Sequence, residues 1–373
     1  MGSRTVLVTG GAGFIGSHLV DRLVELGHRV RILDNLDPQV HPGREKPAYL
    51  NPGAEFIQGD VRDTDTLRRA LRGVEVVFHE AAAVGVGQSQ YQIHRYVDVN
   101  TRGTANLLDM LANEPNSVEK IVVAASMSSY GEGKARCPEC GIVKPSLRPE
   151  AQMAVGDWEV RCPYCRTPTE PVPTDERTER QVNSVYSLTK KDQEDLVLLF
   201  GRTYGVQAVA LRYFNVFGPR QSLSNPYTGV AAIFISRLKN GRPPVIYEDG
   251  RQTRDFVSVH DVVQANILAM QTDLPEPVGL NIGYGTPRTI LGIATTLARL
   301  LDVNIEPDVT GRYRKGDVRH CYADISLARE KLGYEPRVSF EEGMEELIAW
   351  AQDTPAEDKF DLAARELEAK GLV

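Results

Sequence analysis

The chain has 373 residues, of which 42% are hydrophobic and 25% are charged, and its formal net charge at pH 7 is −7. This length suffices for one large domain or two modest ones. Acidic and basic residues are interspersed, which argues against a nucleic-acid-binding surface, and no apolar stretch reaches membrane-spanning length. Because the first predicted strand begins at Thr5, it leaves no room for a signal peptide, and we expect a cytoplasmic protein.

That first strand, over residues 5–8, runs into a glycine-rich turn and a helix predicted over 17–27. The three spaced glycines of the turn allow a sharp bend, a close approach of backbone to a pyrophosphate, and tight packing of helix on strand. Free N–H groups at the start of a helix favour bound phosphate. The pattern predicts a dinucleotide site formed by Gly10, Gly13, Phe14, Ile15 and Gly16.

A second predicted strand, over residues 29–33, ends at Asp34 and Asn35. An acid at this spacing after the glycine-rich turn can accept hydrogen bonds from the adenosine ribose hydroxyls. The same carboxylate would repel a 2′-phosphate, so the sequence favours NAD over NADP.

Strand and helix patterns alternate up to about residue 215, which predicts an α/β fold of the Rossmann type with a doubly wound parallel sheet. The further strands are expected over 55–58, 74–79, 121–125 and 208–212, and the helices over 66–71, 96–111 and 186–204. Ligands gather at the carboxyl ends of such strands. Two pairs that follow strands are therefore candidate cofactor contacts, although each could equally be plain packing: Asp60 with Val61, and Ala81 with Ala82.

After residue 215 the pattern changes to short helices and segments rich in glycine, proline and arginine. We predict an NAD-binding domain over 1–215, with an insert over 134–177. A smaller mixed substrate domain follows over 216–352, and some of its segments return to the first half. A helical tail over 353–373 is expected to pack on the surface.

Tyr186 and Lys190 lie four residues apart on a predicted helix, and therefore on one face of it. An ammonium held near a phenol favours the phenolate and lowers its pKa from about 10. Such a tyrosine can act as a base near neutral pH. The spacing is weak evidence by itself, but beside a predicted dinucleotide site it indicates hydride-transfer chemistry.

Together these motifs resemble the extended short-chain dehydrogenase/reductase family, which contains the nucleotide-sugar epimerases and dehydratases. The resemblance covers nearly the whole chain and includes residues 9–16, 79–82, 186–190, 212–215, 254–257 and 314–317. It implies Ser126, Tyr186 and Lys190 as catalytic residues, with Tyr186 and Lys190 also beside NAD, and Asn100 as a further cofactor contact. The implied substrate contacts are Ser128, Asn215, Arg254, Arg314 and Asp317.

The sequence departs from the dehydratases of this family at Met127 and Ser128, where those relatives carry an acid pair. Decarboxylases are disfavoured for the same reason, which leaves epimerisation at C4. The resemblance is greatest to members that act on dTDP-L-rhamnose. A UDP-hexose or UDP-hexuronate 4-epimerase, a nucleotide-sugar reductase and a non-catalytic NAD-sensing protein remain alternatives. Relatives pair the helices corresponding to 96–111 and 186–204, so a homodimer is expected.

Four of the five cysteines form two Cys-x-x-Cys pairs within the insert, a pattern that fits a structural four-thiolate zinc site. Free or paired thiols are the alternative, and a cytosolic location argues against disulfides. Because the insert falls between Ser126 and Tyr186, we expect a lid or wall over the sugar, or an oligomer contact. The predicted ligands are Cys137, Cys140, Cys162 and Cys165.

Overall fold

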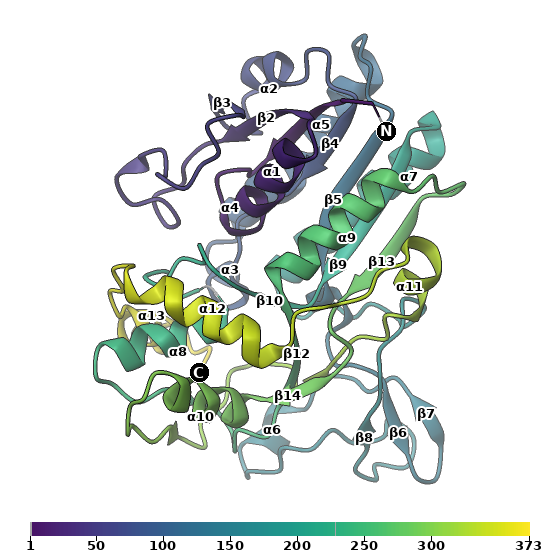
Figure 1. The fold of residues 1–373 in the computed structure, drawn as a ribbon. Coiled ribbons are helices and arrows are strands. Elements are labelled where there is room, and N and C mark those ends of the chain that lie inside the picture. Colours follow the sequence, from purple (N-terminus) through teal and green to yellow (C-terminus); the bar gives the residue numbers. More distant parts are fainter. Residues whose placement is uncertain (1, 228) are drawn as a thin grey trace.

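The computed structural model describes residues 2–227 and 229–373. Its centre is a parallel seven-stranded sheet in the order β13-β9-β5-β4-β1-β2-β3 (Figure 1). This topology confirms the predicted doubly wound Rossmann-type fold. The strands are β1 (Thr5–Thr9), β2 (Arg29–Asp34), β3 (Glu55–Gln58), β4 (Val76–His79), β5 (Lys120–Ser126), β9 (Gln207–Tyr213) and β13 (Val278–Ile282).

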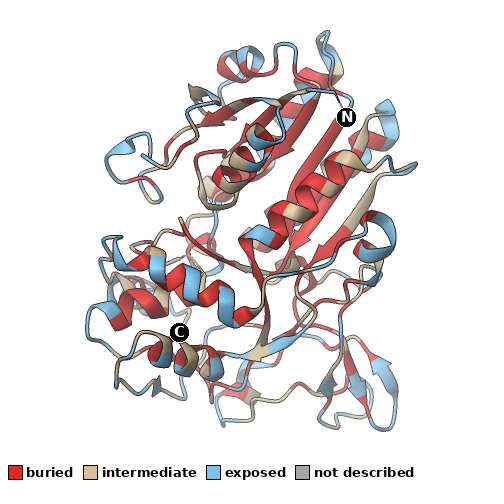
Figure 2. Ribbon diagram, viewed as in Figure 1, coloured by how far each residue is buried: buried red, intermediate tan, exposed pale blue. Residues whose placement is uncertain are grey.

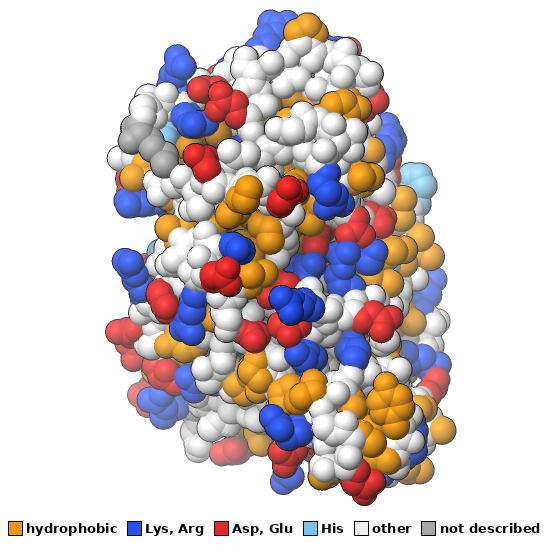
Figure 3. Space-filling model, turned by 90° about the vertical axis from the view of Figure 1, so that its right-hand side faces the viewer, with side chains coloured by type: hydrophobic (Ala, Val, Ile, Leu, Met, Phe, Trp, Pro, Cys, Tyr) orange, Lys and Arg blue, Asp and Glu red, His pale blue; other side chains and the backbone are white. Residues whose placement is uncertain are grey.

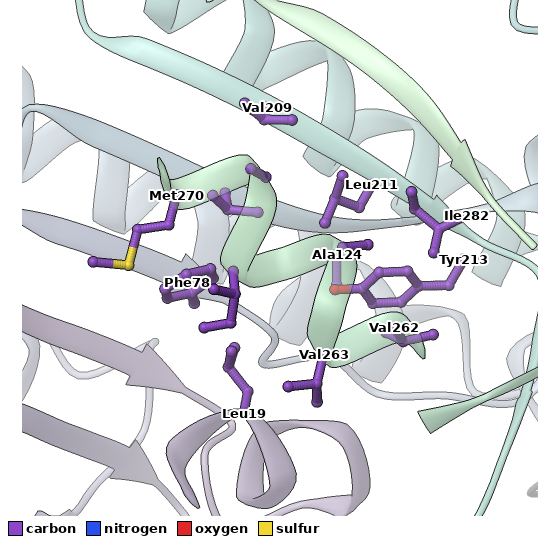
Figure 4. Packing of buried hydrophobic residues seen from close by; sticks show 14 of the residues in the cluster. Leu19, Phe78, Ala124, Val209, Leu211, Tyr213, Val262, Val263, Met270 and Ile282 are labelled. Atoms are coloured by element: carbon purple, nitrogen blue, oxygen red, sulfur yellow. The ribbon is translucent and has the colours of Figure 1, made fainter. Parts of the chain in front are cut away.

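Helices cover both faces of this sheet because successive strand residues point to opposite sides. Val6 and Val8 pack with Leu19 in one apolar cluster, whereas Leu7 packs with Val197 in the other. Full burial of such a side chain contributes about 1.5–3 kcal/mol. The first face carries α1 (Phe14–Glu25) and α9 (Val259–Gln271), seen in Figure 4, and the second carries α2 (Thr64–Ala70), α5 (Gly103–Asn113) and α7 (Val185–Tyr204).

The single helix expected over 96–111 is interrupted in the structure. A π-helical turn over Val97–Arg102 separates α4 (Ile93–Tyr96) from α5. Such turns are frequent at functional sites. This one contains the fully buried Asn100.

The second half of the chain builds a smaller lobe and also contributes β13 and α9 to the first. Its core, which includes Phe217 and Phe256, lies between short strands and helices (Figure 2). The strands are β10 (Asn215–Phe217), β11 (Val245–Ile246), β12 (Thr253–Ser258), β14 (Pro287–Thr289), β15 (Asp308–Val309) and β16 (His320–Cys321). The helices are α8 (Val230–Lys239), α10 (Ile290–Leu300), α11 (Ser326–Leu332), α12 (Phe340–Gln352) and α13 (Phe360–Ala369).

The insert projects from the second lobe as a small sheet in the order β7-β6-β8 (Figure 1). Its apolar cluster contains only Ala135, Cys137, Val143 and Cys162 with Cys165 against them, too few residues to hold a fold by hydrophobic burial. Its elements are β6 (Ala135–Cys137), β7 (Gly141–Val143), α6 (Glu150–Met153) and β8 (Glu170–Pro171).

The surface carries both signs of charge. Figure 3 shows basic and acidic side chains interspersed with apolar ones over one face of the molecule. Among the described residues, no helix combines the length and the apolar character needed to cross a membrane.

Candidate active site

A cavity of about 650 Å³ extends from the first glycine-rich turn to the second lobe. Its walls include the carboxyl ends of β1, β2, β4 and β5, which parallel topology brings to one edge of the sheet. All the candidate cofactor and substrate residues except Asn100 line it. They are Gly10, Gly13, Phe14, Ile15, Gly16, Asp34, Asn35, Asp60, Val61, Ala81, Ala82, Ser126, Ser128, Tyr186, Lys190, Asn215, Arg254, Arg314 and Asp317.

The turn after β1 presents unpaired backbone donors to this cavity. Among the described residues, no protein group accepts a hydrogen bond from the N–H groups of Phe14, Ile15 or Gly16. The first turn of a helix leaves such donors free and carries a partial positive charge. The arrangement therefore fits the pyrophosphate of a dinucleotide.

Two glycines make this turn possible. A Cβ on Gly16 would overlap the carbonyl oxygen of Gly10, and a Cβ on Gly10 would lie 2.8 Å from the backbone nitrogen of Ala81. Gly10 also has φ +70°, which disfavours side-chain-bearing residues. A Cβ on Gly13 would meet only the Gly10 carbonyl oxygen, at 3.3 Å, and would otherwise project into open space at the cavity wall.

Two carboxylates mark the far end of the dinucleotide region. The Asp34 oxygens accept hydrogen bonds from the N–H groups of Ala12 (3.0 Å) and Leu36 (2.9 Å), while burial raises the pKa of this carboxyl. Burial would also raise the pKa of Asp60, but hydrogen bonds from Arg62 and Asn35 lower it to about 2. Asp34 accepts only these two hydrogen bonds among the described residues, so it can also accept from a ligand hydroxyl. Asp60 already accepts four, three from Arg62 and one from Asn35.

The predicted catalytic side chains converge from β5 and α7. Ser126 ends β5, and its hydroxyl accepts hydrogen bonds from the Ser128 hydroxyl (2.9 Å) and N–H (3.2 Å). Tyr186 lies in the first turn of α7, where its backbone N–H donates to the Ser89 hydroxyl at 3.0 Å. The Tyr186 ring packs edge-on against Tyr96, with ring centroids 6.3 Å apart.

The expected effect of Lys190 on Tyr186 is wrong for this structure. Burial raises the pKa of the Tyr186 phenol, opposed by a hydrogen bond with Ser126, and Lys190 is not among the groups that shift it. The Lys190 ammonium instead donates to the Gln193 amide oxygen at 2.7 Å. Helical spacing placed the two side chains on one face, but it does not fix the hydrogen-bond partner of a long side chain.

Lys190 is the last member of a buried network of hydrogen bonds that begins at Thr9, beside the first glycine-rich turn. The His79 ring bonds the hydroxyls of Thr9 (2.8 Å) and Thr104 (2.9 Å), and Thr104 accepts from the Gln193 amide at 2.9 Å. Burial and the nearby Lys190 charge lower the pKa of His79 to about 3, so the ring stays neutral. The sequence alone does not indicate this hydrogen-bond network, because its members come from four separate elements.

Glu80 is a further cavity residue that sequence reasoning missed. Its carboxylate accepts a hydrogen bond from the Tyr213 hydroxyl at 2.9 Å. Burial raises the pKa of Glu80 to about 7, opposed by that hydrogen bond and by the charge of Lys190. An ionisable residue directly after an apolar strand, at the predicted ligand edge, was the available signal.

The second lobe contributes a cluster of cations. The Arg314 guanidinium lies 5.0 Å from the centre of the Tyr247 ring and pairs with Asp317 at 2.9 Å. Arg254 also approaches Asp317, at 3.4 Å. Nearby, the buried amide oxygen of Asn215 has no hydrogen-bond partner among the described residues. Guanidinium groups suit phosphate oxygens, and an unpaired buried polar atom suits a ligand-binding residue.

The C-terminal tail contributes one side of its helix to the cavity wall, through Phe360, Ala363, Ala364, Leu367 and Leu372. The Glu366 carboxylate accepts from the hydroxyls of Tyr91 (2.7 Å) and Tyr227 (2.6 Å), which ties α13 to the loop after β4 and to the second lobe. An amphipathic helix gives no sign of which surface it covers, so the sequence could not reveal this contact.

Two other candidates lie away from the cavity wall. The Asn100 amide bonds both backbone groups of Ala83 (2.7 and 3.1 Å) and the Thr189 hydroxyl (3.0 Å), so it joins the loop after β4 to α7. No residue of the insert 134–177, all of which the structure describes, lines the cavity. The expectation of a lid or wall over the sugar is therefore wrong.

The four insert cysteines form one cluster. Their sulfur atoms all lie within 4.8 Å of one another, and the Cys137 and Cys165 sulfurs are 3.4 Å apart. A disulfide requires about 2.05 Å, whereas the edge of a tetrahedral zinc–thiolate site is about 3.8 Å. The cluster could therefore hold a metal ion.

Comparison with known proteins places this geometry in a family. The model of the NAD dependent epimerase/dehydratase family matches residues 6–151 and 162–283, and the unmatched stretch between them lies inside the insert. The chain belongs to this family.

Individual relatives agree with that assignment. The chain is 36% identical to the dTDP-L-rhamnose 4-epimerase of Burkholderia thailandensis, over 93% of this chain and 94% of that protein. It also resembles the UDP-glucose 4-epimerase of Thermotoga maritima solved with UDP-glucose, with a TM-score of 0.76 and 33% identity over 93% of this chain and 98% of that one. The UDP-glucose 4-epimerase of Thermus thermophilus in complex with NAD gives a TM-score of 0.74 and 29% identity over 94% and 100%. The predicted family and an NAD-dependent epimerase-type enzyme are thereby confirmed.

In this epimerase/dehydratase family member, the two contrasting glycines yield a paired test. Gly16→Ala should lower stability by at least about 1 kcal/mol, because the added methyl group overlaps backbone that cannot move away cheaply. Gly13→Ala should leave stability nearly unchanged and weaken NAD binding, since its methyl group would project from the wall into the cavity space. Urea unfolding and calorimetric titration with NAD distinguish the two. Equal stability of both variants would contradict the proposed contact.

A second prediction concerns the buried Glu80 carboxyl. Because the folded protein holds this proton up to about pH 7, Glu80 contributes stability below about pH 4.5 that is lost as the pH rises to 7. Glu80→Gln removes that loss. Relative to the wild type, the free energy of unfolding of the variant should therefore increase by about 1–3 kcal/mol as the pH is raised from 5 to 8. Urea unfolding at pH 5 and at pH 8 measures this increase, with the exposed Glu119→Gln as control. A gain that does not change with pH would contradict the raised pKa.

Proposed function

We propose that this protein is a nucleotide-sugar 4-epimerase that uses tightly held NAD and acts on a dTDP-6-deoxyhexose such as dTDP-L-rhamnose. The observation that carries the proposal is a single cavity that joins the first glycine-rich turn, the Ser126 and Tyr186 hydroxyls, and the guanidinium groups of Arg254 and Arg314. Such a cavity suits a dinucleotide and a nucleotide sugar that meet at the tyrosine.

NAD fits the residues at the first turn. The free N–H groups of Phe14, Ile15 and Gly16 would hold the pyrophosphate, and the Asp34 carboxylate would accept from ribose hydroxyls. When bound, NAD supplies the hydride acceptor and donor that inversion at C4 of a sugar requires. Lys190 lies at the cavity wall, where its ammonium can hold the nicotinamide ribose.

Side chains of the protein then bind the sugar oxygen and transfer its proton. Tyr186 takes the proton of the C4 hydroxyl and later returns it, and the Ser126 hydroxyl holds the same oxygen. Ser128 donates to Ser126 and so fixes the direction of its hydroxyl.

The chemistry between these residues favours epimerisation over elimination. Met127 and Ser128 offer no carboxyl group to act as the acid and base of a dehydratase. Val84 from the loop after β4, Val86 at the start of the short helix α3 (Val86–Ser89) and Leu367 from α13 contribute apolar side chains to the cavity wall. An apolar stretch suits the methyl group of a 6-deoxyhexose better than a hydroxymethyl or carboxylate group. The 36% identity to a dTDP-L-rhamnose 4-epimerase supports the same choice.

We also propose a homodimer. Large apolar side chains are exposed on the helices predicted over 96–111 and 186–204 and just before the first of them. Val97 lies within the first range and Ile93 precedes it in α4, while Leu188 and Leu199 lie on α7, and each is between 42% and 55% exposed. A second copy could bury this surface in a four-helix bundle. The cytoplasmic location stays a prediction.

Zinc is the metal we propose for the cysteine cluster. Four thiolates satisfy a tetrahedral zinc ion completely and leave no open position for catalysis, so the ion would be structural. The few apolar residues of the insert could not hold it together alone.

Replacement of the tyrosine hydroxyl tests the reaction. Tyr186→Phe should lower turnover at least about 100-fold, because the proton then has no acceptor, while bound NAD and nucleotide affinity stay the same. Tyr204→Phe, at the exposed end of the same helix, is the matched control. The assay incubates purified protein with a panel of dTDP- and UDP-sugars, without added NAD, and follows C4 epimers by chromatography.

Each outcome of that assay decides between alternatives. Interconversion of dTDP-L-rhamnose and its C4 epimer supports the proposal, whereas conversion of UDP-sugars alone identifies a UDP-hexose or UDP-hexuronate epimerase. A requirement for stoichiometric reduced cofactor identifies a reductase. Wild-type turnover in Tyr186→Phe would remove the tyrosine from the mechanism, and the absence of any conversion by the wild type favours an NAD sensor.

Loss of one cysteine tests the metal. The purified wild type should contain about one zinc per chain, and Cys140→Ser should lose it and become susceptible to proteolysis within the insert while keeping bound NAD. Cys321→Ala, outside the cluster, should keep its zinc. Elemental analysis and limited proteolysis measure both effects. A wild type that carries no metal when purified with zinc in the medium would contradict the assignment.

A further inference from the structure

A row of buried charges lies between the insert and the cavity. Arg148 and Glu132 belong to the region around the insert, and Glu248 and Arg319 belong to the second lobe. The side chains of all four are at most 2% exposed. Two cations and two anions buried together are costly unless their hydrogen bonds are closely matched. The mechanism uses none of them, so their role needs an explanation.

Arg148 makes the contacts that cross from the insert to the second lobe. Its guanidinium donates hydrogen bonds to both carboxylate oxygens of Glu248, at 2.8 and 2.9 Å, and to the backbone carbonyl of Asp317 at 3.1 Å. Within the insert, the same guanidinium donates to the carbonyl of Trp158 at 3.0 Å. One side chain therefore links the insert to two separate segments of the substrate lobe.

Arg319 closes the row from the other side. Its guanidinium pairs with Glu248 (2.9 Å), with Asp249 (2.6 Å) and with Glu159 of the insert (2.6 Å). Its backbone carbonyl accepts a hydrogen bond from Arg254 at 3.1 Å. The Glu132 carboxylate accepts from the backbone N–H of Arg319 at 2.8 and 3.0 Å.

These residues adjoin the cavity wall directly. Glu248 follows Tyr247, whose ring carries the Arg314 guanidinium, and Arg319 comes shortly after Asp317 and Val318. Glu248 also has a φ of 57°, a strained conformation for a side-chain-bearing residue that persists only where the surroundings enforce it. The buried row thus contacts the segments that carry the arginines of the cavity wall: Arg148 bonds the Asp317 carbonyl, and Arg254 bonds the Arg319 carbonyl.

We propose that Arg148 is a positioning residue through which the cysteine-bearing insert fixes the cavity-lining segment 314–318 and Arg254, and thereby sets the affinity for the diphosphate of the substrate. This inference rests on the proposed function, since it assumes that these arginines bind a nucleoside diphosphate group. Without the planar guanidinium of Arg148, Glu248 loses its bidentate partner and the Asp317 carbonyl loses a hydrogen-bond donor. The segment that carries Arg314 is then free to shift.

The test replaces the guanidinium of Arg148 and keeps its positive charge. Arg148→Lys retains a cation but cannot make the planar bidentate contact and the third donation together. Arg161→Lys is the matched control, because Arg161 lies in the same insert, pairs with Asp157 at 2.6 Å and does not reach the second lobe. The NAD-loaded, zinc-loaded enzyme is titrated with dTDP and with UDP by calorimetry, and KM and kcat are measured with the sugar that it converts.

Arg148→Lys should weaken dTDP or UDP binding and raise KM about tenfold, with kcat and bound NAD within about twofold of the wild type. Arg161→Lys should change none of these. A role in stability alone would lower the melting temperature and leave the nucleotide affinity unchanged, which would overturn the proposal. Glu159→Gln, a milder change at a half-exposed partner of Arg319, should weaken binding about two- to threefold. It decides the question if Arg148→Lys does not fold, and unchanged affinity in it would then overturn the proposal.

A further arm separates this inference from the proposed function. Arg314→Ala removes a cavity-lining guanidinium and leaves the buried row intact. If neither Arg314→Ala nor Arg148→Lys alters dTDP or UDP affinity, the lobe does not bind the nucleotide and the proposed function itself fails. If Arg314→Ala weakens binding and Arg148→Lys does not, the proposed function stands and the positioning role fails.

Discussion

The contact between the backbones of Gly10 and Gly16 sets the position of the whole ligand edge. It brings the first helix so close to the end of β1 that its N–H groups point into the cavity. Gly10 also lies against the backbone of Ala81, so the loops after β1 and β4 share one point of closest approach. Only glycine satisfies this steric constraint. The candidate catalytic groups on β5 and α7 are placed relative to that point by the parallel sheet.

Buried charge is handled in two ways around the cavity. Lys190 is 4% exposed, and its ammonium donates to the Gln193 amide oxygen. Burial lowers the pKa of Lys190, and the charge of the Glu80 carboxylate opposes that shift. The second arrangement, the row that contains Arg148 and Arg319, uses bidentate pairs, Arg148 with Glu248 and Arg319 with Asp249. The first arrangement leaves the Lys190 ammonium at the cavity wall, where a ligand can reach it, and the second joins the insert to the second lobe.

The sequence was informative where a local pattern fixes local structure. The apolar β-branched strands, the glycine-rich turn and the Tyr186–Lys190 spacing all depend on neighbouring residues, and the sheet, the family and the cavity residues followed from them. It failed where contacts are distant in sequence. Nothing near Arg148 indicates Glu248, and the partner of a long side chain such as Lys190 depends on several elements. Burial also changed the expected direction of the Tyr186 pKa.

The location of α13 has a practical consequence for handling the protein. Leu372 lies at the cavity, and its carbonyl accepts a hydrogen bond from the backbone of Lys315, whereas the N-terminal end lies on the other side of the molecule (Figure 1). A purification tag fused after Val373 would therefore emerge beside the cavity. Fusions, labels and surface attachments belong at the amino end, where they leave the cavity free.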